Sequence, residues 1–565
     1  MTLSLLTFAL AARNVFTPCG GPCTSDGFTI GSICPDKCAE CQSDGILAPW
    51  SNSSRAGFPS DHNCQVSPNA YYKGRPTAAP SALFAATSDG KPASVLSMRD
   101  YNTPLHFTRV TVPTTLRVRL ASDTTSSSNY TLRPARLAAR VGVTAAGDEL
   151  ELKLSEPAYL VLKLGAEQSP LLIFADAPPP PPPSGPGVIS VASRGVKPSI
   201  RPEYASQDQG DAMQAAIDEL LANDTLHTLV IPASGGDGSA TYVVHDLHVR
   251  NAPGRIHKQI VLEDGVLLQR SGGHIGALTS PGFFTIHNSS NFTLRGLATL
   301  DAFNGGQGLY VADSSDVLVD GLMVRNSWWW NTEIEHSTRL TLSNYIALND
   351  PGLPFHQNDG VNFEHSTHVA LRRAFLVSAD DLTCVKADPE DGAGLDGSYT
   401  PDIGEVVVDD VVGLNPDYDI SLKLGWGAAA RRIYNVSYSN IDLVDLYPVS
   451  RPGDVINLYL TLVHRDKPVE VTNISFTNIT FDKQGIKVDM PHGYAHVKGV
   501  RFENIVGQRG NFSSIELSGH SDEYGIDDVL FRDVYLGGRL LTAESAAADG
   551  MKVAFARGVR YESSV

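Results

Sequence analysis

Short runs of alternating apolar and polar residues recur along the C-terminal two-thirds of the chain. Each run is typical of a strand, followed by one or two bend-forming Gly, Asn or Asp residues and a further strand. Nine such runs follow at intervals mostly in the twenties to thirties of residues, and they begin at Asn291, Asp316, Arg339, His368, Glu405, Tyr434, Val471, Val497 and Asp528. One repeat of this size cannot bury its apolar face alone. The pattern therefore predicts an all-β chain in which residues 188–565 form a right-handed parallel β-helix.

One stretch has helical periodicity instead. Residues 210–223 place Met213, Ile217 and Leu220 on one apolar face, and Asp211 lies near the start, where a carboxylate suits the helix dipole. A single helix ahead of a long β series predicts a cap that shields the open end of the β-helix from edge pairing.

The residues before the β-helix divide by composition into four segments. Residues 76–177 hold short alternating runs between Gly, Ser and Asp turns, which predicts an antiparallel β-sandwich. Six consecutive prolines in residues 178–187 predict a stiff linker. Residues 13–75 contain six of the seven cysteines, an even number that favours disulfides over half of a zinc site. Residues 1–12 end in a short apolar run that resembles the end of a signal peptide.

Charge and composition narrow the classes of partner. A net charge of −18 disfavours nucleic acid and anionic membrane surfaces, both of which need clustered Lys and Arg. No run approaches the roughly 18 consecutive apolar residues of a membrane span, so a transmembrane helix is not expected. The cysteine-rich segment favours a secreted or extracellular protein, modestly supported by nine Asn-x-Ser/Thr sequons at Asn52, Asn129, Asn223, Asn288, Asn291, Asn435, Asn473, Asn478 and Asn511.

The candidate chemistry lies in three carboxylates. Asp380 and Asp381 follow Asp359 at a separation that matches one predicted coil. Residues one coil apart in a parallel stack lie about 4.8 Å apart. Carboxylates this close do not ionise independently, so one can stay protonated as an acid while another acts as a base, as in glycosidases. Because successive strand residues face opposite sides, the chain must bend at Asp380 and Asp381 for both to reach one substrate.

The motifs around these carboxylates resemble those of β-helix glycoside hydrolases of family 28 (polygalacturonases) and family 49 (dextranase and isopullulanase). Asn358-Asp359-Gly360 is similar to the Asn-Thr-Asp of family 28 without its threonine, and Ala379-Asp380-Asp381 is similar to its Gly-Asp-Asp, at the family's spacing. Residues 326–330, Asn-Ser-Trp-Trp-Trp, resemble its Asn-Ser-Pro-aromatic stretch. The resemblance covers roughly residues 188–560.

The departures from family 28 point toward family 49. The Gly-His-Gly of family 28 is absent, and its Arg-Ile-Lys appears as Ser421-Leu422-Lys423, without the arginine that grips a uronate carboxylate. Leu424-Gly425-Trp426 and a β-sandwich ahead of the β-helix resemble family 49, whose substrates are neutral α-glucans.

The resemblance implies an inverting hydrolysis in which Asp380 protonates the leaving oxygen while Asp359 and Asp381 activate water. Lys423, about two coils beyond Asp381 by the same spacing, is expected to project onto the same face. The six candidate substrate-binding residues are His356, Gln357, Asn358, Lys423, Trp426 and Trp330. Cys384 stands alone in an apolar stretch and is expected to be a buried structural thiol.

Three functional hypotheses remain open. The first is a secreted, monomeric glycoside hydrolase without cofactor or metal, acting on an α-glucan or, as second choice, a pectic polymer. The second is a non-catalytic carbohydrate-binding protein on the same scaffold. The third is a β-helix lyase or epimerase that needs Ca²⁺ or a Lys or Arg base. The acidic residues of 388–396 could hold Ca²⁺, but a solvated loop is the more common role of such a segment.

Overall fold

A computed structural model describes most of the chain beyond residue 77. The described residues are 47–49, 64–66, 78–98, 105–121, 129–164, 169–199, 208–233, 240–271, 282–303, 306–327, 330–349, 358–378, 380–387, 401–414, 420–426, 430–445, 454–460, 468–482, 485–490 and 494–564. The predicted signal peptide and almost all of the cysteine-rich segment lie outside them, apart from the antiparallel strands β1 (Leu47–Pro49) and β2 (Cys64–Val66).

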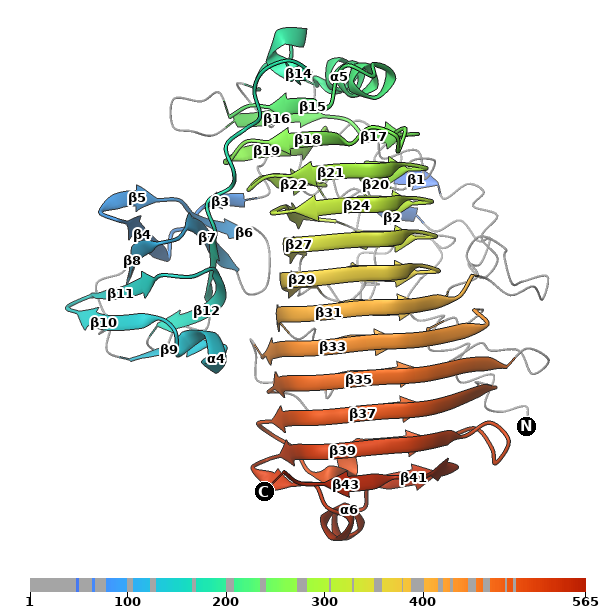
Figure 1. Ribbon diagram of the computed structural model, residues 1–565. Helices are drawn as coiled ribbons and strands as arrows, with labels where there is room; N and C mark the ends of the chain where they lie inside the picture. The colour runs from blue at the N-terminus through green and yellow to red at the C-terminus, as the bar shows by residue number, and fades with distance from the viewer. Residues whose placement is uncertain are drawn as a thin grey trace.

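Two long sheets of stacked strands form the parallel β-helix, which confirms the fold predicted from the repeats (Figure 1). The first sheet has 11 strands: β17 (Leu247–Arg250), β20 (Gly282–His287), β23 (Gln307–Ala312), β26 (Thr332–Glu335), β28 (Val361–Glu364), β30 (Thr383–Lys386), β32 (Leu422–Leu424), β34 (Ile456–Tyr459), β36 (Ile486–Asp489), β38 (Ile515–Ser518) and β41 (Lys552–Ala554). Every neighbouring pair that joins β17 to β41 in this sheet is parallel.

The second sheet has 19 strands. They are β14 (Val188–Ser190), β15 (Thr228–Ile231), β16 (Ala240–Val244), β18 (Lys258–Leu262), β19 (Val266–Arg270), β21 (Ser290–Arg295), β22 (Thr299–Asp301), β24 (Ser315–Asp320), β25 (Met323–Arg325), β27 (Thr338–Leu348), β29 (Thr367–Val377), β31 (Ile403–Leu414), β33 (Arg432–Val444), β35 (Val469–Phe481), β37 (Ala495–Gly507), β39 (Ile526–Leu536), β40 (Arg539–Leu540), β42 (Ala556–Arg557) and β43 (Arg560–Glu562).

The second sheet bends at a recurrent left-handed residue. Pairs of short strands in the early coils, such as β24 and β25, give way to single long strands from β27 onward, and each long strand carries a positive φ near its middle. These residues are Asn344, Arg373, Asp410, Asn440, Asn478, Asn504 and Asp533. Asn and Asp tolerate this conformation better than most residues, so the Asn and Asp positions in the repeats mark the bends.

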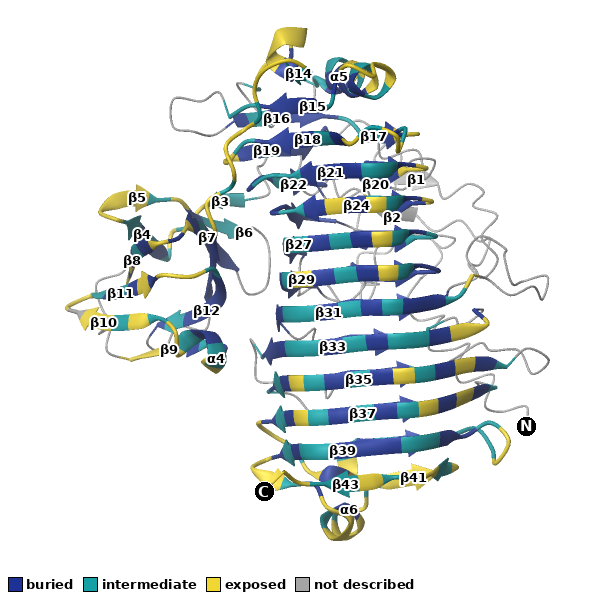
Figure 2. Ribbon diagram, in the orientation of Figure 1, coloured by how far each residue is buried: buried dark blue, intermediate teal, exposed yellow. Residues whose placement is uncertain are grey.

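Apolar side chains from both sheets fill the interior of the β-helix. Figure 2 shows that buried residues recur along the stacked strands. Near the C-terminal end they include a row of stacked rings, from Tyr438 through Phe476, Phe502 and Phe531 to Tyr561, with centroids 5.0–5.8 Å apart. Identical positions of successive coils lie above one another, so each interior residue packs on its equivalent in the next coil.

Within the part of the chain that the structure describes, helices are few and lie mainly at the ends of the β-helix. The predicted cap is present as α5 (Gly210–Ala222), whose Met213, Ile217 and Leu220 join the interior apolar cluster. The C-terminal end carries α6 (Ala543–Asp549), and the remaining short turns are η1 (Val191–Arg194), η3 (Phe512–Ser514) and α4 (Ala135–Ala138).

Residues 78–176 form two smaller sheets. The five-stranded sheet contains β4 (Phe84–Ser88), β5 (Lys91–Ala93), β8 (Thr114–Leu120), β10 (Gly142–Ala146) and β11 (Glu149–Leu154). The six-stranded sheet contains β3 (Ala78–Pro80), β6 (Val95–Met98), β7 (His106–Thr111), β9 (Tyr130–Arg133), β12 (Ala158–Leu164) and β13 (Leu171–Asp176). The pairings are antiparallel except that β7 and β13 run parallel, so the six-stranded sheet differs from the purely antiparallel one predicted. No helix or strand occurs in the proline-rich residues 178–187.

The two small sheets pack against one flank of the β-helix (Figure 1). Their apolar core is continuous with β-helix side chains that include Ile346, Phe375 and Val412. At the edge of this contact, the Arg136 guanidinium pairs with Asp442 and, at 2.9 Å, with Asp410. Among the described residues, the β-helix side chains of this shared core all belong to the 19-stranded sheet and none to the 11-stranded one.

Candidate active site

Asp359 and Asp381 occupy the same position in two successive coils. Each precedes its strand of the 11-stranded sheet by two residues, and Val361 of β28 pairs in register with Thr383 of β30. The separation of the two aspartates is therefore one coil of the β-helix, as the sequence predicts.

Gly360 permits the close approach of these two coils. Its backbone N–H donates a 2.8 Å hydrogen bond to the carbonyl oxygen of Asp381. A Cβ at this position would lie 2.4 Å from the carbonyl oxygen of Leu382, a distance that real Cβ atoms essentially never show. The glycine that follows Asp359 is thus a packing requirement of the site.

A bend before β30 brings the side chains of Asp380 and Asp381 to one side. The hydroxyl of Ser378 donates to the carbonyl oxygens of Asp380 at 2.7 Å and Asp381 at 3.0 Å, which fixes the turn. The backbone N–H of Asp381 donates to Oδ1 of Asp380 at 2.9 Å. The predicted bend is present, and it depends on a serine that the sequence analysis did not single out.

The three carboxylates form one cluster. Each offers an oxygen atom, and these oxygens all lie within 4.8 Å of one another. Asp359 is 4% exposed and Asp381 is 2% exposed, whereas Asp380 is partly exposed. Solvent and substrate therefore reach the cluster most readily at Asp380.

Two buried lysines face this cluster. Nζ of Lys423 lies 2.8 Å from Oδ2 of Asp381, and Nζ of Lys386 lies 3.9 Å from Oδ2 of Asp359. Buried charges persist only when they are paired, so the two ammonium groups stabilise two of the three carboxylates in the ionised form. Lys386 was missed by the sequence analysis, although it lies in β30 on the same face as Cys384, two residues away.

Lys386 also contacts Trp330, which lies one coil before Asp359. Its Nζ is 3.3 Å from the centroid of the Trp330 ring, a cation–π contact, and Trp330 is only 5% exposed. The face of the ring that carries the ammonium is not open to a sugar. Asn362 completes this side of the cluster, because its Nδ2 donates to Oδ2 of Asp359 at 2.8 Å.

The other predicted substrate-binding residues fall in different places. Asn358 is fully buried, and its carbonyl oxygen accepts a 2.9 Å hydrogen bond from Nδ2 of Asn349. Trp426 is partly exposed and stacks on Tyr459, with ring centroids 5.6 Å apart and planes 16° apart. His356 and Gln357 lie outside the described residues.

The prediction that Lys423 lies about two coils beyond Asp381 was wrong. Cys384 and Lys423 are direct neighbours in the parallel ladder, so the lysine lies one coil beyond Asp381 and not two. This coil is unusually long, because the chain from Thr383 to its ladder partner Leu422 is much longer than the chain from Val361 to its partner Thr383.

The thiol of Cys384 lies between these groups but is not a reactive one. Its side chain is buried, as predicted, and burial raises the pKa of Cys384 well above its ordinary value. A protonated, enclosed thiol is a poor nucleophile.

Among the described residues, Asp359, Asp380 and Asp381 are the one group of three or more acidic, His or Cys side chains close enough to hold a metal ion. Carboxylate oxygens suit a hard divalent cation. However, two ammonium groups already supply positive charge at this cluster, so its charge balance does not require such an ion.

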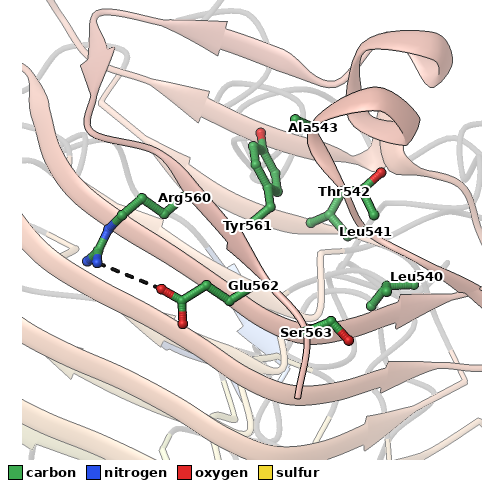
Figure 3. Close-up of a pocket in the computed structure, with 8 residues that line it drawn as sticks. All are labelled: Leu540, Leu541, Thr542, Ala543, Arg560, Tyr561, Glu562 and Ser563. Atoms are coloured by element: carbon green, nitrogen blue, oxygen red, sulfur yellow. Dashed lines mark ion pairs between the residues drawn. The ribbon is translucent and has the colours of Figure 1, made fainter. Parts of the chain in front are cut away.

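A separate pocket of about 540 Å³ lies at the C-terminal end of the β-helix. Figure 3 shows that Arg560 and Glu562, which form an ion pair at 3.8 Å, line it together with Leu540, Leu541, Thr542, Ala543, Tyr561 and Ser563. Its one carboxylate also pairs with Arg532 at 2.7 Å, so this pocket lacks a pair of acids for hydrolysis.

Structure comparison finds a similar solved structure in Dex49A from Penicillium minioluteum, a family 49 dextranase. The two chains are 12% identical, the match covers 86% of this chain and 94% of Dex49A, and the TM-score is 0.58. The chain has the fold of Dex49A. A family 28 exopolygalacturonase from Yersinia enterocolitica (13% identity, 80% and 96% coverage, TM-score 0.42) and a polygalacturonase from Erwinia carotovora ssp. carotovora (10% identity, 69% and 98% coverage, TM-score 0.46) also match.

The sequence comparisons give no match: no protein-family model and no curated protein is similar to this chain. The likeness to Dex49A thus lies in the three-dimensional structure, and it concerns the fold. Within the described part of the chain, none of the helices has the length and hydrophobicity needed to cross a membrane.

Proposed function

We propose that this chain is a glycoside hydrolase that uses Asp359, Asp380 and Asp381 to cleave a neutral polysaccharide. The observation that carries the proposal is the geometry of the cluster: three carboxylates from two coils, with oxygens within 4.8 Å and two facing ammonium groups. The fold shared with Dex49A, a family 49 dextranase, supports the same class of reaction.

The burial and the charges suggest a role for each acid. Three carboxylates and two ammonium groups leave one negative charge unmatched within this set, and a proton on one carboxyl removes it. Asp380 is the most accessible of the three and protonates the leaving glycosidic oxygen. Asp359 and Asp381, each with a lysine partner, remain carboxylates that accept the proton of the attacking water.

The lysines also bear on the class of substrate. A uronate carboxylate needs a cation to bind it, but Lys423 is 2.8 Å from Asp381 and Lys386 is buried between Asp359 and Trp330. The stretch Ser421-Leu422-Lys423 also lacks an arginine. We therefore favour an α-glucan over a pectic polymer.

The stereochemistry of the reaction has two candidates. The resemblance to families 28 and 49 implies inversion, for which acid and base are usually about 6.5–9.5 Å apart. In the present cluster one oxygen of each carboxylate lies within 4.8 Å of an oxygen of the other two, so retention through a carboxylate nucleophile is the alternative. Proton NMR of the first anomer released from an oligosaccharide distinguishes inversion, which we propose, from retention.

The central experiment is reducing-sugar release from dextran, other α-glucans and pectic polymers. We expect release from an α-glucan, and we expect Asp380→Asn to lower the rate about 10²- to 10⁴-fold, the usual contribution of a general acid. Asp402→Asn is a matched control, because Asp402 pairs with Arg432 at 2.5 Å outside the cluster. No release from any polymer, or undiminished activity of Asp380→Asn, would refute the proposal.

We also propose that the protein is secreted. The apolar N-terminal run, the cysteine-rich segment and the nine sequons support this. A tagged full-length chain recovered from the culture medium rather than from cells would agree with it.

A further inference from the structure

A third coil of the same sheet carries an aspartate at the position of Asp359 and Asp381. The parallel register places Val361, Thr383, Leu422 and Ile456 side by side on successive strands. Two residues before each of these lie Asp359, Asp381, Ile420 and Asp454 in the same order. Asp454 is thus two coils beyond Asp381, a distance of about 10 Å along the axis.

The surroundings of Asp454 resemble those of Asp359. Nδ2 of Asn457 donates to Oδ2 of Asp454 at 3.2 Å, as Nδ2 of Asn362 donates to Oδ2 of Asp359 at 2.8 Å. Both are Asp-x-x-Asn arrangements. Nζ of Lys487, from the next coil, lies 3.0 Å from Oδ2 of Asp454, as a lysine of the next coil faces Asp381.

One polar atom of this second group is left without a partner. Asn457 is 3% exposed, and its Oδ1 makes no hydrogen bond within the described part of the chain. A buried acceptor without a donor costs free energy, so it is uncommon unless something else supplies the donor. Oδ1 of Asn362, beside the cluster of Asp359, Asp380 and Asp381, is likewise buried and makes no hydrogen bond within the described part of the chain.

Aromatic rings border the second group on the side of the catalytic cluster. Tyr459 follows Asn457 by two residues in β34 and so lies on the same face of the sheet. Its ring stacks on Trp426, and both side chains are partly exposed. Aromatic rings of this kind contact the apolar C–H surface of a sugar.

We propose that Asp454, Asn457, Lys487 and Tyr459 form a sugar-binding subsite, two coils away from the carboxylates that cleave the polymer. This inference rests on the proposed function, because it places a distal part of the same substrate along the same face. The carboxylate and the amide oxygen accept hydrogen bonds from sugar hydroxyls, and the ammonium group donates one.

The ligand class follows from the pairing of charges. Lys487 is neutralised by Asp454, so the subsite offers no unpaired cation to a uronate, and an added carboxylate would face Asp454 directly. Burial also raises the pKa of Asp454 against the opposing effect of Lys487. A polar group kept at such a cost is typical of a binding site. The subsite therefore suits a neutral, hydroxyl-rich sugar ring.

The test is calorimetric binding of neutral α-1,6-linked gluco-oligosaccharides of increasing length to the full chain carrying Asp380→Asn, which slows turnover. We expect the affinity to rise with the length of the oligosaccharide until the oligosaccharide is long enough to reach Asp454. Adding Asp454→Asn should then lower affinity for the long oligosaccharides at least about tenfold, the loss expected for one hydrogen bond to a charged group. The loss should be confined to oligosaccharides long enough to span both sites, and galacturonides of equal length should bind more weakly.

Controls separate this inference from the proposed function. Lys487→Met is a second variant of the subsite, and Asp402→Asn, outside both groups, should leave affinity unchanged; thermal unfolding verifies that each variant is folded. If long and short oligosaccharides bind Asp454→Asn and its parent equally well, or if none binds, the subsite is refuted. The proposed function fails separately, when the wild-type protein releases no sugar from any polymer.

Discussion

Replacing Lys423 by methionine tests the charge balance of the candidate active site. Lys423 and Asp381 are 2.8 Å apart, and their side chains are 10% and 3% exposed. At an effective dielectric constant of about 20, two unit charges at this distance attract by about 6 kcal/mol. Desolvation cancels part of this attraction, but removing one partner leaves Asp381 as a buried, uncompensated charge. We therefore expect Lys423→Met to lower the free energy of unfolding by about 3–5 kcal/mol.

The assay is guanidinium unfolding followed by circular dichroism, with the tertiary signal monitored by tryptophan fluorescence. Lys487→Met is the matched control, because its ion pair with Asp454 is 3.0 Å long but the side chains are 32% and 19% exposed. Solvent screens this pair better, so its loss should cost only about 1 kcal/mol. The double variant Asp381→Asn with Lys423→Met should recover part of the loss, since it removes both charges. The reasoning is wrong if the two lysine variants lose the same stability, or if the double variant is the least stable.

Four further predictions concern other groups. Lys386→Met should lose at least about 2 kcal/mol of stability, because it removes the desolvated cation–π contact with Trp330 and the charge that faces the buried Asp359. Lys386→Arg should recover part of the loss, as measured by urea unfolding. The fully buried Lys258 donates a 2.8 Å hydrogen bond to the carbonyl oxygen of Asn223, which follows α5. Lys258→Met should therefore lower the free energy of unfolding by about 1–3 kcal/mol. The control Lys498→Met, at an exposed lysine, should change it little. Burial raises the pKa of Asp454, so ionisation of this group destabilises the folded wild-type protein as the pH rises, and Asp454→Asn does not lose this stability. The Tm of Asp454→Asn minus the Tm of wild type should therefore increase between about pH 4 and 7. Chelation should leave activity unchanged if the lysines supply the positive charge, and activity lost to a chelator and restored by Ca²⁺ would instead support a lyase.

The position of the acids was predictable because the β-helix makes one spacing visible in the sequence. The separation of Asp359 from Asp381 equals that of the ladder partners Val361 and Thr383, and parallel register leaves no freedom once the coil length is known. The same reasoning failed for Lys423, because the coil from Thr383 to Leu422 is much longer. A period inferred from one coil does not transfer to another that contains a long insertion.

The partners of the acids were not predictable in the same way. Lys386 contacts Trp330 although the two are far apart in the sequence, and this contact depends on where two side chains of different coils point, which periodicity alone does not give. The sequence did contain a signal for the second group, which consists of Asp454, Asn457 and Lys487. The Asp-x-x-Asn arrangement at Asp359 occurs again at Asp454, and aligning the coils on the strand that follows would have placed them in one row.

The pattern of apolar residues also records which coils the smaller sheets cover. In β27, β29 and β33 the four residues after the left-handed bend are all buried, because one face points to the interior and the other lies under the small sheets. In β35 and β37 the residues after the bend alternate instead between buried and half-buried positions, so the outward side of the strand is less completely covered there. An unbroken apolar run thus marks a strand buried on both faces, and alternation marks one whose outward face is only partly covered. On the 11-stranded sheet the outward positions are instead Asn362, Cys384, Lys423, Asn457 and Lys487, mostly polar side chains on the face that carries the acids. The apolar flank is thus the one that the chain covers with its own sheets, and this polar row is where a carbohydrate is expected to lie.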